Sequence, residues 1–182
     1  MDTYRDVRGF FREKLLQALE RLEMATAEAT EQYLVELLST FAVADRKELQ
    51  TPFVELLSDA YTARGSERAF RLRDVGDSAL FVSGYLADSM RRRGVTVTYC
   101  VSVGQRAYAE AGSALGAVAL SDLAQRFSAF VRVLDEVREQ TSHRTDGELV
   151  RLYERWLASD SPELFHRLGR YGVVARRKAF DA

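Results

Sequence analysis

Polar residues are embedded in the most apolar part of the chain, the stretch 72–115, and their types suit ligand binding. Arg73, Asp77 and Tyr85 could line a polar pocket, with Ser83 and Gly84 allowing a ligand to approach the helix backbone. We therefore predict a ligand site made by these five residues.

The same stretch also allows an enzyme and a purely structural interpretation. A dispersed catalytic site around Asp74, Asp77 and Tyr85 is the enzymatic alternative. In the structural interpretation, Asp77 caps the start of a helix and Asp74 pairs with a neighbouring arginine at a turn. Gly76 and Gly84, like Gly104 and Gly112, are spaced at two helical turns, which favours close helix packing over ligand approach.

Residues that commonly bind metals or act as nucleophiles are scarce. The two histidines are His143 and His166, and no Glu-x-x-His pattern of a di-iron bundle occurs. The single cysteine, Cys100, has apolar neighbours, which favours a buried, inert thiol. Neither a phosphate-binding loop nor a nucleophile elbow is present. We predict no catalytic residue, metal or cofactor; haem held by His166 in a globin-like sensor stays open as an alternative.

Two short basic clusters, 91–93 and 176–178, raise the question of nucleic-acid binding. The segment after Gly94 is apolar and rich in small residues, which is a poor surface for reading a DNA groove. The net charge of −1 also provides no general attraction to nucleic acid or membranes. We favour helix ends and a solvated tail over a nucleic-acid interface, with an acidic protein partner as the remaining option.

Helical elements must position these residues, because apolar side chains recur at helical spacing along the chain. The predicted helices cover about 1–24, 33–41, 53–61, 77–93, 99–115, 120–140, 149–156 and 162–170, with a short segment capped by Ser66 at 66–74. Thr51-Pro52 and Ser161-Pro162 each place proline at a first helical position after a capping residue. The segments 77–93 and 99–115 form a central hairpin, the 120–140 helix packs against it, and the first helix could be an arm that embraces a second copy.

One segment has the alternation of a strand instead. Valines and a tyrosine alternate with smaller, more polar residues across 95–103. A single strand in a helical chain would leave its edges unpaired unless it paired across a dimer. We favour a helix that starts near Thr96 or Thr98, and therefore predict one all-α domain, 1–182, of seven or eight helices.

Composition is that of one globular domain. The chain has 182 residues, 47% of them hydrophobic and 29% charged. The first residues lack the apolar core of a signal peptide, and no apolar run approaches the roughly 20 residues that span a bilayer. Among the 26 basic residues, lysine is rare, a bias typical of GC-rich bacterial genomes. We expect a bacterial cytoplasmic protein that forms a homodimer and makes no membrane contact.

The run LRDVGDSALFVSGYLADSM, together with Arg93-Gly94-Val95 and the stretch from Tyr99 to Tyr108, resembles a motif of uncharacterised all-helical bacterial proteins. The resemblance covers about 40 residues. It implies a helical fold and supplies no activity or site residue.

With no catalytic constellation visible, we predict a non-enzymatic bacterial interaction or regulatory module that binds a partner protein or a small ligand. The helical ligand or cofactor sensor and the enzyme with a dispersed site are the alternatives.

Overall fold

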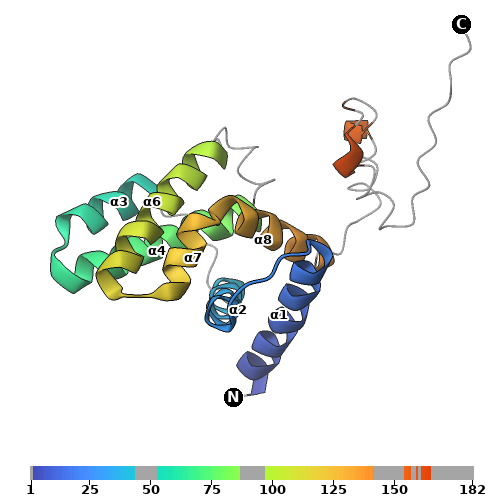
Figure 1. Cartoon of the computed structure of the whole chain (residues 1–182), viewed down its shortest axis with the longest axis horizontal. Helices are drawn as coiled ribbons and strands as arrows, with labels where there is room; N and C mark the ends of the chain where they lie inside the picture. The colour runs from blue at the N-terminus through green and yellow to red at the C-terminus, as the bar shows by residue number, and fades with distance from the viewer. Residues whose placement is uncertain are drawn as a thin grey trace, which may run out of the picture. The chain divides into compact units, whose positions relative to one another are not determined.

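The computed structural model describes residues 2–43, 53–86, 97–141, 154–156, 159 and 161–164. Internal contacts divide the chain into two units, Met1–Thr141 and Ser142–Ala182. All labelled helices of Figure 1 belong to the first unit. They are α1 (Asp2–Arg21), α2 (Glu28–Val43), α3 (Phe53–Thr62), α4 (Gly65–Gly84), α6 (Val97–Leu115), α7 (Val118–Gln125) and α8 (Phe127–Thr141). The described residues contain no strand, which confirms the all-α prediction.

The antiparallel pair α4 and α6 forms the most extensive helix contact in the first unit. Small residues allow the two helices to approach closely. A Cβ built on Gly76 would lie 2.6 Å from Cε1 of Tyr108, and one built on Gly104 would lie 2.7 Å from Cβ of Ala79. Both distances are below any ordinary van der Waals contact, so glycine is required at both positions.

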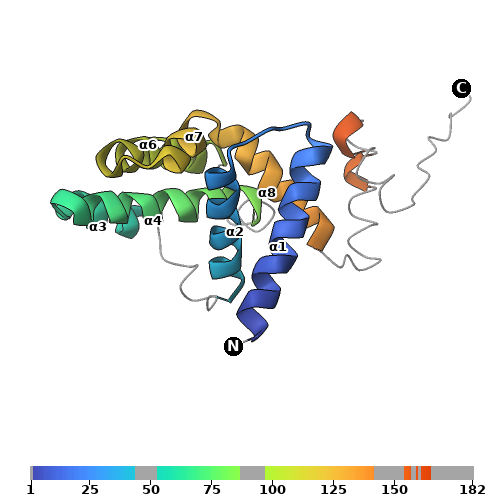
Figure 2. The same cartoon turned by 60° about the horizontal axis from the view of Figure 1, so that its bottom comes forward.

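The other two glycines of the predicted pattern lie against the neighbouring helices. A Cβ on Gly84 would lie 2.6 Å from Cβ of Leu134 in α8, and one on Gly112 would lie 3.0 Å from Oγ of Ser121 in α7. The prediction that the glycines serve close helix packing is therefore confirmed. Figures 1 and 2 show α3, α4, α6 and α7 grouped together, as their contacts require.

The predicted boundaries of the hairpin are wrong at its first arm. A continuous helix, α4, runs from Gly65 to Gly84, so no short segment ends at Asp74 and Asp77 lies inside the helix instead of capping it. The physical reason is that Gly76 is needed for packing against Tyr108 and does not break the helix. The predicted stop at Gly94 and the cluster 91–93 lie outside the described residues.

The alternation across 95–103 belongs to a helix over its described part. Helix α6 begins at Val97, and its buried residues follow helical spacing: Cys100, Gly104, Ala107, Tyr108, Ala111 and Gly112. The preference for a helix is confirmed from Val97 onward. Tertiary burial of this one face outweighs the local period of two.

The predicted helix 120–140 is instead two helices, α7 and α8, separated at Arg126. This residue has φ −115° and ψ 28°, outside the helical region. Its guanidinium donates to the carbonyl oxygen of Ala25 at 2.8 Å and pairs with Asp122. Thr26 and Thr30 also donate to Asp122, so the break coincides with a polar anchor for the α1–α2 connection.

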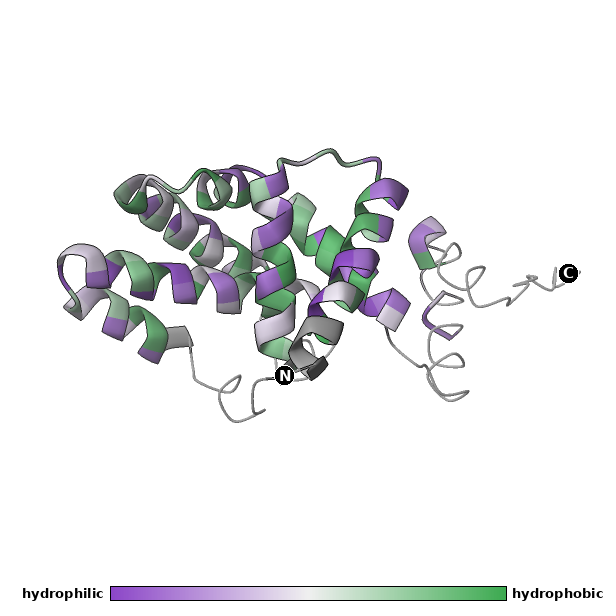
Figure 3. Ribbon diagram, turned by 90° about the horizontal axis from the view of Figure 1, so that it is seen from below, coloured by the Kyte–Doolittle hydropathy of each residue, from purple (hydrophilic) through white to green (hydrophobic). Residues whose placement is uncertain are grey.

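Helix α1 packs along α2 and α8 of its own chain (Figures 1 and 2). Its buried face consists of Phe11, Leu15, Ala18 and Leu19. Arg21 at its end pairs with Glu136 of α8 at 2.8 Å. Figure 3 shows hydrophilic and hydrophobic segments in turn along the helices of the first unit, the pattern of helices that are buried on one side. A role of α1 as an arm toward a second copy stays a prediction.

The second unit has few described residues. The backbone N–H of Leu164 donates to Oγ of Ser161 at 3.5 Å, at the start of a helical turn that contains Pro162. Ser161 therefore caps this turn as predicted. Thr51-Pro52 lies outside the described residues. Across the described parts of both units, no helix has the length and apolar character to cross a bilayer.

Candidate functional site

Asp77 of α4 joins three helices through its side chain. The hydroxyl of Tyr33 in α2 donates to Oδ1 at 2.6 Å, and the hydroxyl of Tyr108 in α6 donates to the same oxygen at 2.8 Å. Arg73, one turn earlier on α4, places Nε 3.9 Å from Oδ2. The structure therefore brings two of the predicted ligand-site residues, Arg73 and Asp77, together with two tyrosines.

Burial sets the protonation of this cluster. It raises the pKa of Asp77 to about 6, although the hydrogen bonds from Tyr33 and Tyr108 act in the opposite direction. Burial and then the Asp77 carboxylate raise the pKa of both tyrosines, so their hydroxyls stay protonated and keep donating. Asp77 is 20% exposed, and both of its oxygens face protein donors. These hydrogen bonds link α2, α4 and α6 to one another.

Ser83, Gly84 and Tyr85 lie about two turns further along α4 and do not contact this cluster. Helix α8 covers Gly84, where a ligand was predicted to approach. The hydroxyl of Tyr85 lies 2.7 Å from Oγ1 of Thr141 in α8, and its ring stacks on Phe81. Ser83 is buried, and its Oγ has no hydrogen-bond partner among the described residues. The five predicted residues therefore do not converge on one place.

The alternative enzymatic set does not converge either. Asp74 accepts a hydrogen bond from its neighbour Arg73 at 2.9 Å, the ion pair that the structural interpretation predicts. Cys100 is fully buried, and burial raises the pKa of its thiol, as an inert cysteine requires. No group of three or more potential metal ligands occurs within the described ranges. His143, His166 and the cluster 176–178 lie outside them.

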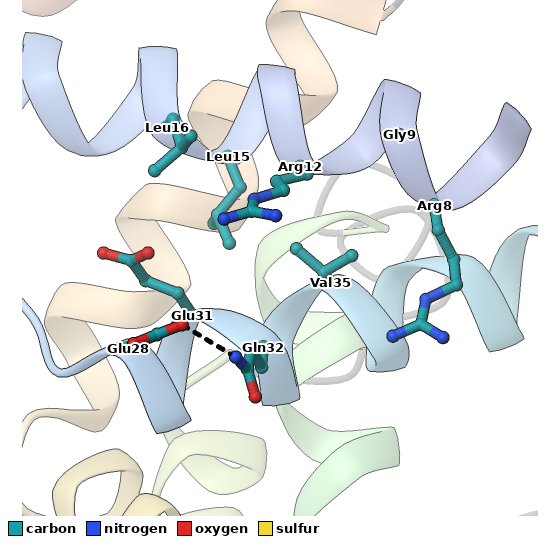
Figure 4. A pocket seen from close by; sticks show the side chains of 9 residues that line it. All are labelled: Arg8, Gly9, Arg12, Leu15, Leu16, Glu28, Glu31, Gln32 and Val35. Carbon is teal, nitrogen blue, oxygen red and sulfur yellow. Dashed lines mark hydrogen bonds between the residues drawn. The ribbon is translucent and has the colours of Figure 1, made fainter. Parts of the chain in front are cut away.

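A pocket of about 330 Å³ lies between α1 and α2, away from the residues that the sequence singled out. It is lined by Arg8, Gly9, Arg12, Leu15, Leu16, Glu28, Glu31, Gln32 and Val35 (Figure 4). Leu15 and Val35 are buried and form an aliphatic floor, whereas Leu16 is 43% exposed. An apolar floor with polar groups around it is the usual construction of a small-molecule site.

The charges of this pocket come from both helices and are only partly paired. Arg8 pairs with Glu36 at 3.2 Å, and Glu28 accepts a hydrogen bond from Nε2 of Gln32 at 3.0 Å. Arg12 and Glu31 make no side-chain hydrogen bond or ion pair within the described part of the chain. In Figure 4 the Arg12 side chain extends from α1 toward α2, and that of Glu31 extends from α2 toward α1.

Gly9 keeps the arginine end of the pocket open. A Cβ at this position would meet no atom within 4 Å, in contrast to the glycines of α4 and α6. Sequence reasoning missed this site because α1 matched an ordinary amphipathic helix. A usable signal was present: Arg8 and Arg12 share one helical face and flank a glycine, which is unfavourable within a helix unless space is needed.

Comparisons with known proteins identify no relative. No protein-family description matches the chain, no curated protein matches it, and no solved structure matches it.

Proposed function

We propose that this protein is a non-enzymatic regulatory module that binds a small ligand in the α1–α2 pocket. The observation that carries the proposal is the combination of a buried aliphatic floor with two charged side chains, Arg12 and Glu31, that have no protein partner among the described residues. Charged groups without partners beside a concave apolar surface can bind a ligand without first breaking an internal ion pair.

The lining residues support binding over catalysis. They offer guanidinium, carboxylate and amide groups around leucine and valine, and none is a serine, cysteine, histidine or lysine. The pocket therefore lacks a hydroxyl, thiol or amine nucleophile with an adjacent imidazole base, and its two glutamates are more simply ligand contacts. A ligand seated between α1 and α2 would instead bridge two helices, and it would stabilise the arrangement in which they form the pocket.

The bacterial and cytoplasmic setting and the homodimer belong to the same proposal. Phe10 of α1 is 45% exposed, with Nζ of Lys14 5.9 Å from its ring centroid, and is the position at which we test contact between α1 and a second copy. Light scattering on the native chain should give the mass of a dimer, and Phe10→Glu should shift it toward the monomer. An unchanged monomer mass at high protein concentration would refute the dimer and leave the pocket proposal intact.

Gly9 provides the direct test of the pocket. Gly9→Phe would place a ring where the space is open, whereas Gly9→Ala adds only a methyl group and serves as the matched control. Saturation-transfer NMR with four six-carbon probes, hexanoate, hexylamine, norleucine and 6-aminohexanoate, should show binding to native protein and Gly9→Ala. Gly9→Phe should lose it. Absence of binding by all four probes, or equal binding to both variants, would refute a ligand site in this pocket.

A further inference from the structure

The two walls of the α1–α2 pocket carry opposite charges. Helix α1 contributes arginines, and helix α2 contributes glutamates and one glutamine. Arg8 pairs with Glu36, which lies outside the lining, and Glu28 keeps its negative charge while accepting a hydrogen bond from the neutral amide of Gln32. Arg12 and Glu31 are the two lining charges that have no partner among the described residues, and each lies on a different wall.

These two groups define what kind of ligand the pocket can satisfy. An anion alone would pair with Arg12 but would lie in the field of Glu31, and a cation alone would meet the reverse situation. A molecule with both charges satisfies both walls, while an aliphatic body packs against Leu16, the exposed apolar side chain of the lining. The volume of about 330 Å³ is near the lower end of small-ligand pockets, which are roughly 300–1,000 Å³, so the ligand must be small.

We propose that the pocket binds a small zwitterion with an aliphatic body, of the amino-acid class, whose acidic group pairs with Arg12 and whose amino group pairs with Glu31. Arg12 can hold a carboxylate through two parallel N–H donors, which fixes its orientation. Glu31 accepts the hydrogen bonds of the ammonium group. This assignment rests on the proposed function, since it specifies the ligand of the same pocket.

Isothermal titration with the same four six-carbon probes tests the ligand class. Norleucine and 6-aminohexanoate carry both charges, hexanoate carries only the anion, and hexylamine carries only the cation. At least one zwitterion should bind roughly tenfold more tightly than either singly charged probe, the size expected for one additional charge-assisted hydrogen bond. The protein is used as the full chain near neutral pH and low salt.

Two charge-removing variants assign the contacts. Arg12→Gln should reduce zwitterion affinity to about that of hexylamine, and Glu31→Gln should reduce it to about that of hexanoate. Arg132→Gln, an exposed arginine on α8 that does not line the pocket, is the matched control and should bind like the native protein. Circular dichroism confirms that each variant is folded.

The outcomes separate this inference from the proposed function. If hexanoate or hexylamine binds as tightly as both zwitterions, and Gly9→Phe abolishes that binding, the pocket is a ligand site and the zwitterion is refuted. The same conclusion follows if Arg12→Gln and Glu31→Gln leave zwitterion affinity unchanged. If none of the four probes binds, both proposals fail.

Discussion

Two regions of the first unit both place an acidic side chain and an arginine beside apolar residues, and they use these charges differently. In the α2–α4–α6 cluster, the Asp77 carboxylate faces Tyr33, Tyr108 and Arg73. In the α1–α2 pocket, Arg12 and Glu31 have no partner among the described residues and flank an aliphatic floor. The contrast teaches that a charged residue beside apolar residues indicates a ligand site only when no other residue of the protein pairs with its charge.

The largest expected effect is that of truncating Tyr108. This side chain is fully buried in the first cluster, so Tyr108→Ala should lower the free energy of unfolding by roughly 3–5 kcal/mol. Tyr99 lies on the same helix but is 46% exposed, and Tyr99→Ala should change the free energy of unfolding by about 0.5 kcal/mol or less. Urea denaturation measures both. Equal losses of stability for the two variants would contradict the role of Tyr108 as a buried side chain that links α6 to α4.

The next effect is a pH dependence of stability that originates at Asp77. Burial raises its pKa from 3.8 to about 6, so the folded state holds a proton in a pH range where the unfolded state does not. Folding therefore gains stability as the pH falls from about 6 to about 4. With about 1.4 kcal/mol per pKa unit, the gain is on the order of 2–3 kcal/mol.

Asp77→Asn should remove this pH-dependent component. The difference in unfolding free energy between native protein and Asp77→Asn, measured from pH 4 to pH 7, should shift in favour of the native protein toward the acidic end. Asp74→Asn is the matched control, because Asp74 is adjacent on the same helix and 51% exposed. A difference that stays constant with pH would show that Asp77 does not titrate in this range.

A pair of glycine substitutions sharpens the contrast between a filled and an open region. Gly76→Ala should destabilise the protein by roughly 1–3 kcal/mol, because its Cβ would overlap the Tyr108 ring. Gly9→Ala should stabilise it by about 0.5–1 kcal/mol, because its Cβ enters open space and alanine favours the helix. Thermal unfolding would detect both changes in stability. If both variants were stabilised, or both destabilised, the contrast between a filled region at Gly76 and an open one at Gly9 would be wrong.

The smallest effect on stability is expected in the pocket. Arg12→Gln and Glu31→Gln should each change the unfolding free energy by about 0.5 kcal/mol or less, because neither residue has a described partner to lose. Their effect should instead be on zwitterion binding. A loss of more than about 1 kcal/mol in urea denaturation would mean that these charges stabilise the fold and are not held ready for a ligand.

Much of the fold could be predicted from the sequence, because helical periodicity is a local property. The all-helical class, the helix over the described part of 95–103 and the close-packing glycines are confirmed. The boundary at Asp77 was wrong because a carboxylate after a glycine matches a helix start when only neighbouring residues are considered. The break at Arg126 was missed for a similar reason, since its hydrogen bond to Ala25 joins it to a residue 101 positions earlier in the chain.

The candidate site was less accessible to sequence reasoning. Arg73 and Asp77 do meet, but Tyr33 lies 44 residues before Asp77 and Tyr108 lies 31 residues after it. The pocket depends on which faces of α1 and α2 lie toward each other. The spacing of residues within either helix does not determine this pairing of faces.

The sequence by itself therefore determined the helical character of the protein, the apolar stripe of each helix and the positions where only glycine permits close contact. These features follow from the period of the helix and the volume of single side chains. Only the tertiary structure decided which polar groups find partners and which do not. That outcome depends on the pairing of distant helices, which completed the hydrogen bonds of Asp77 and left Arg12 and Glu31 facing the α1–α2 pocket.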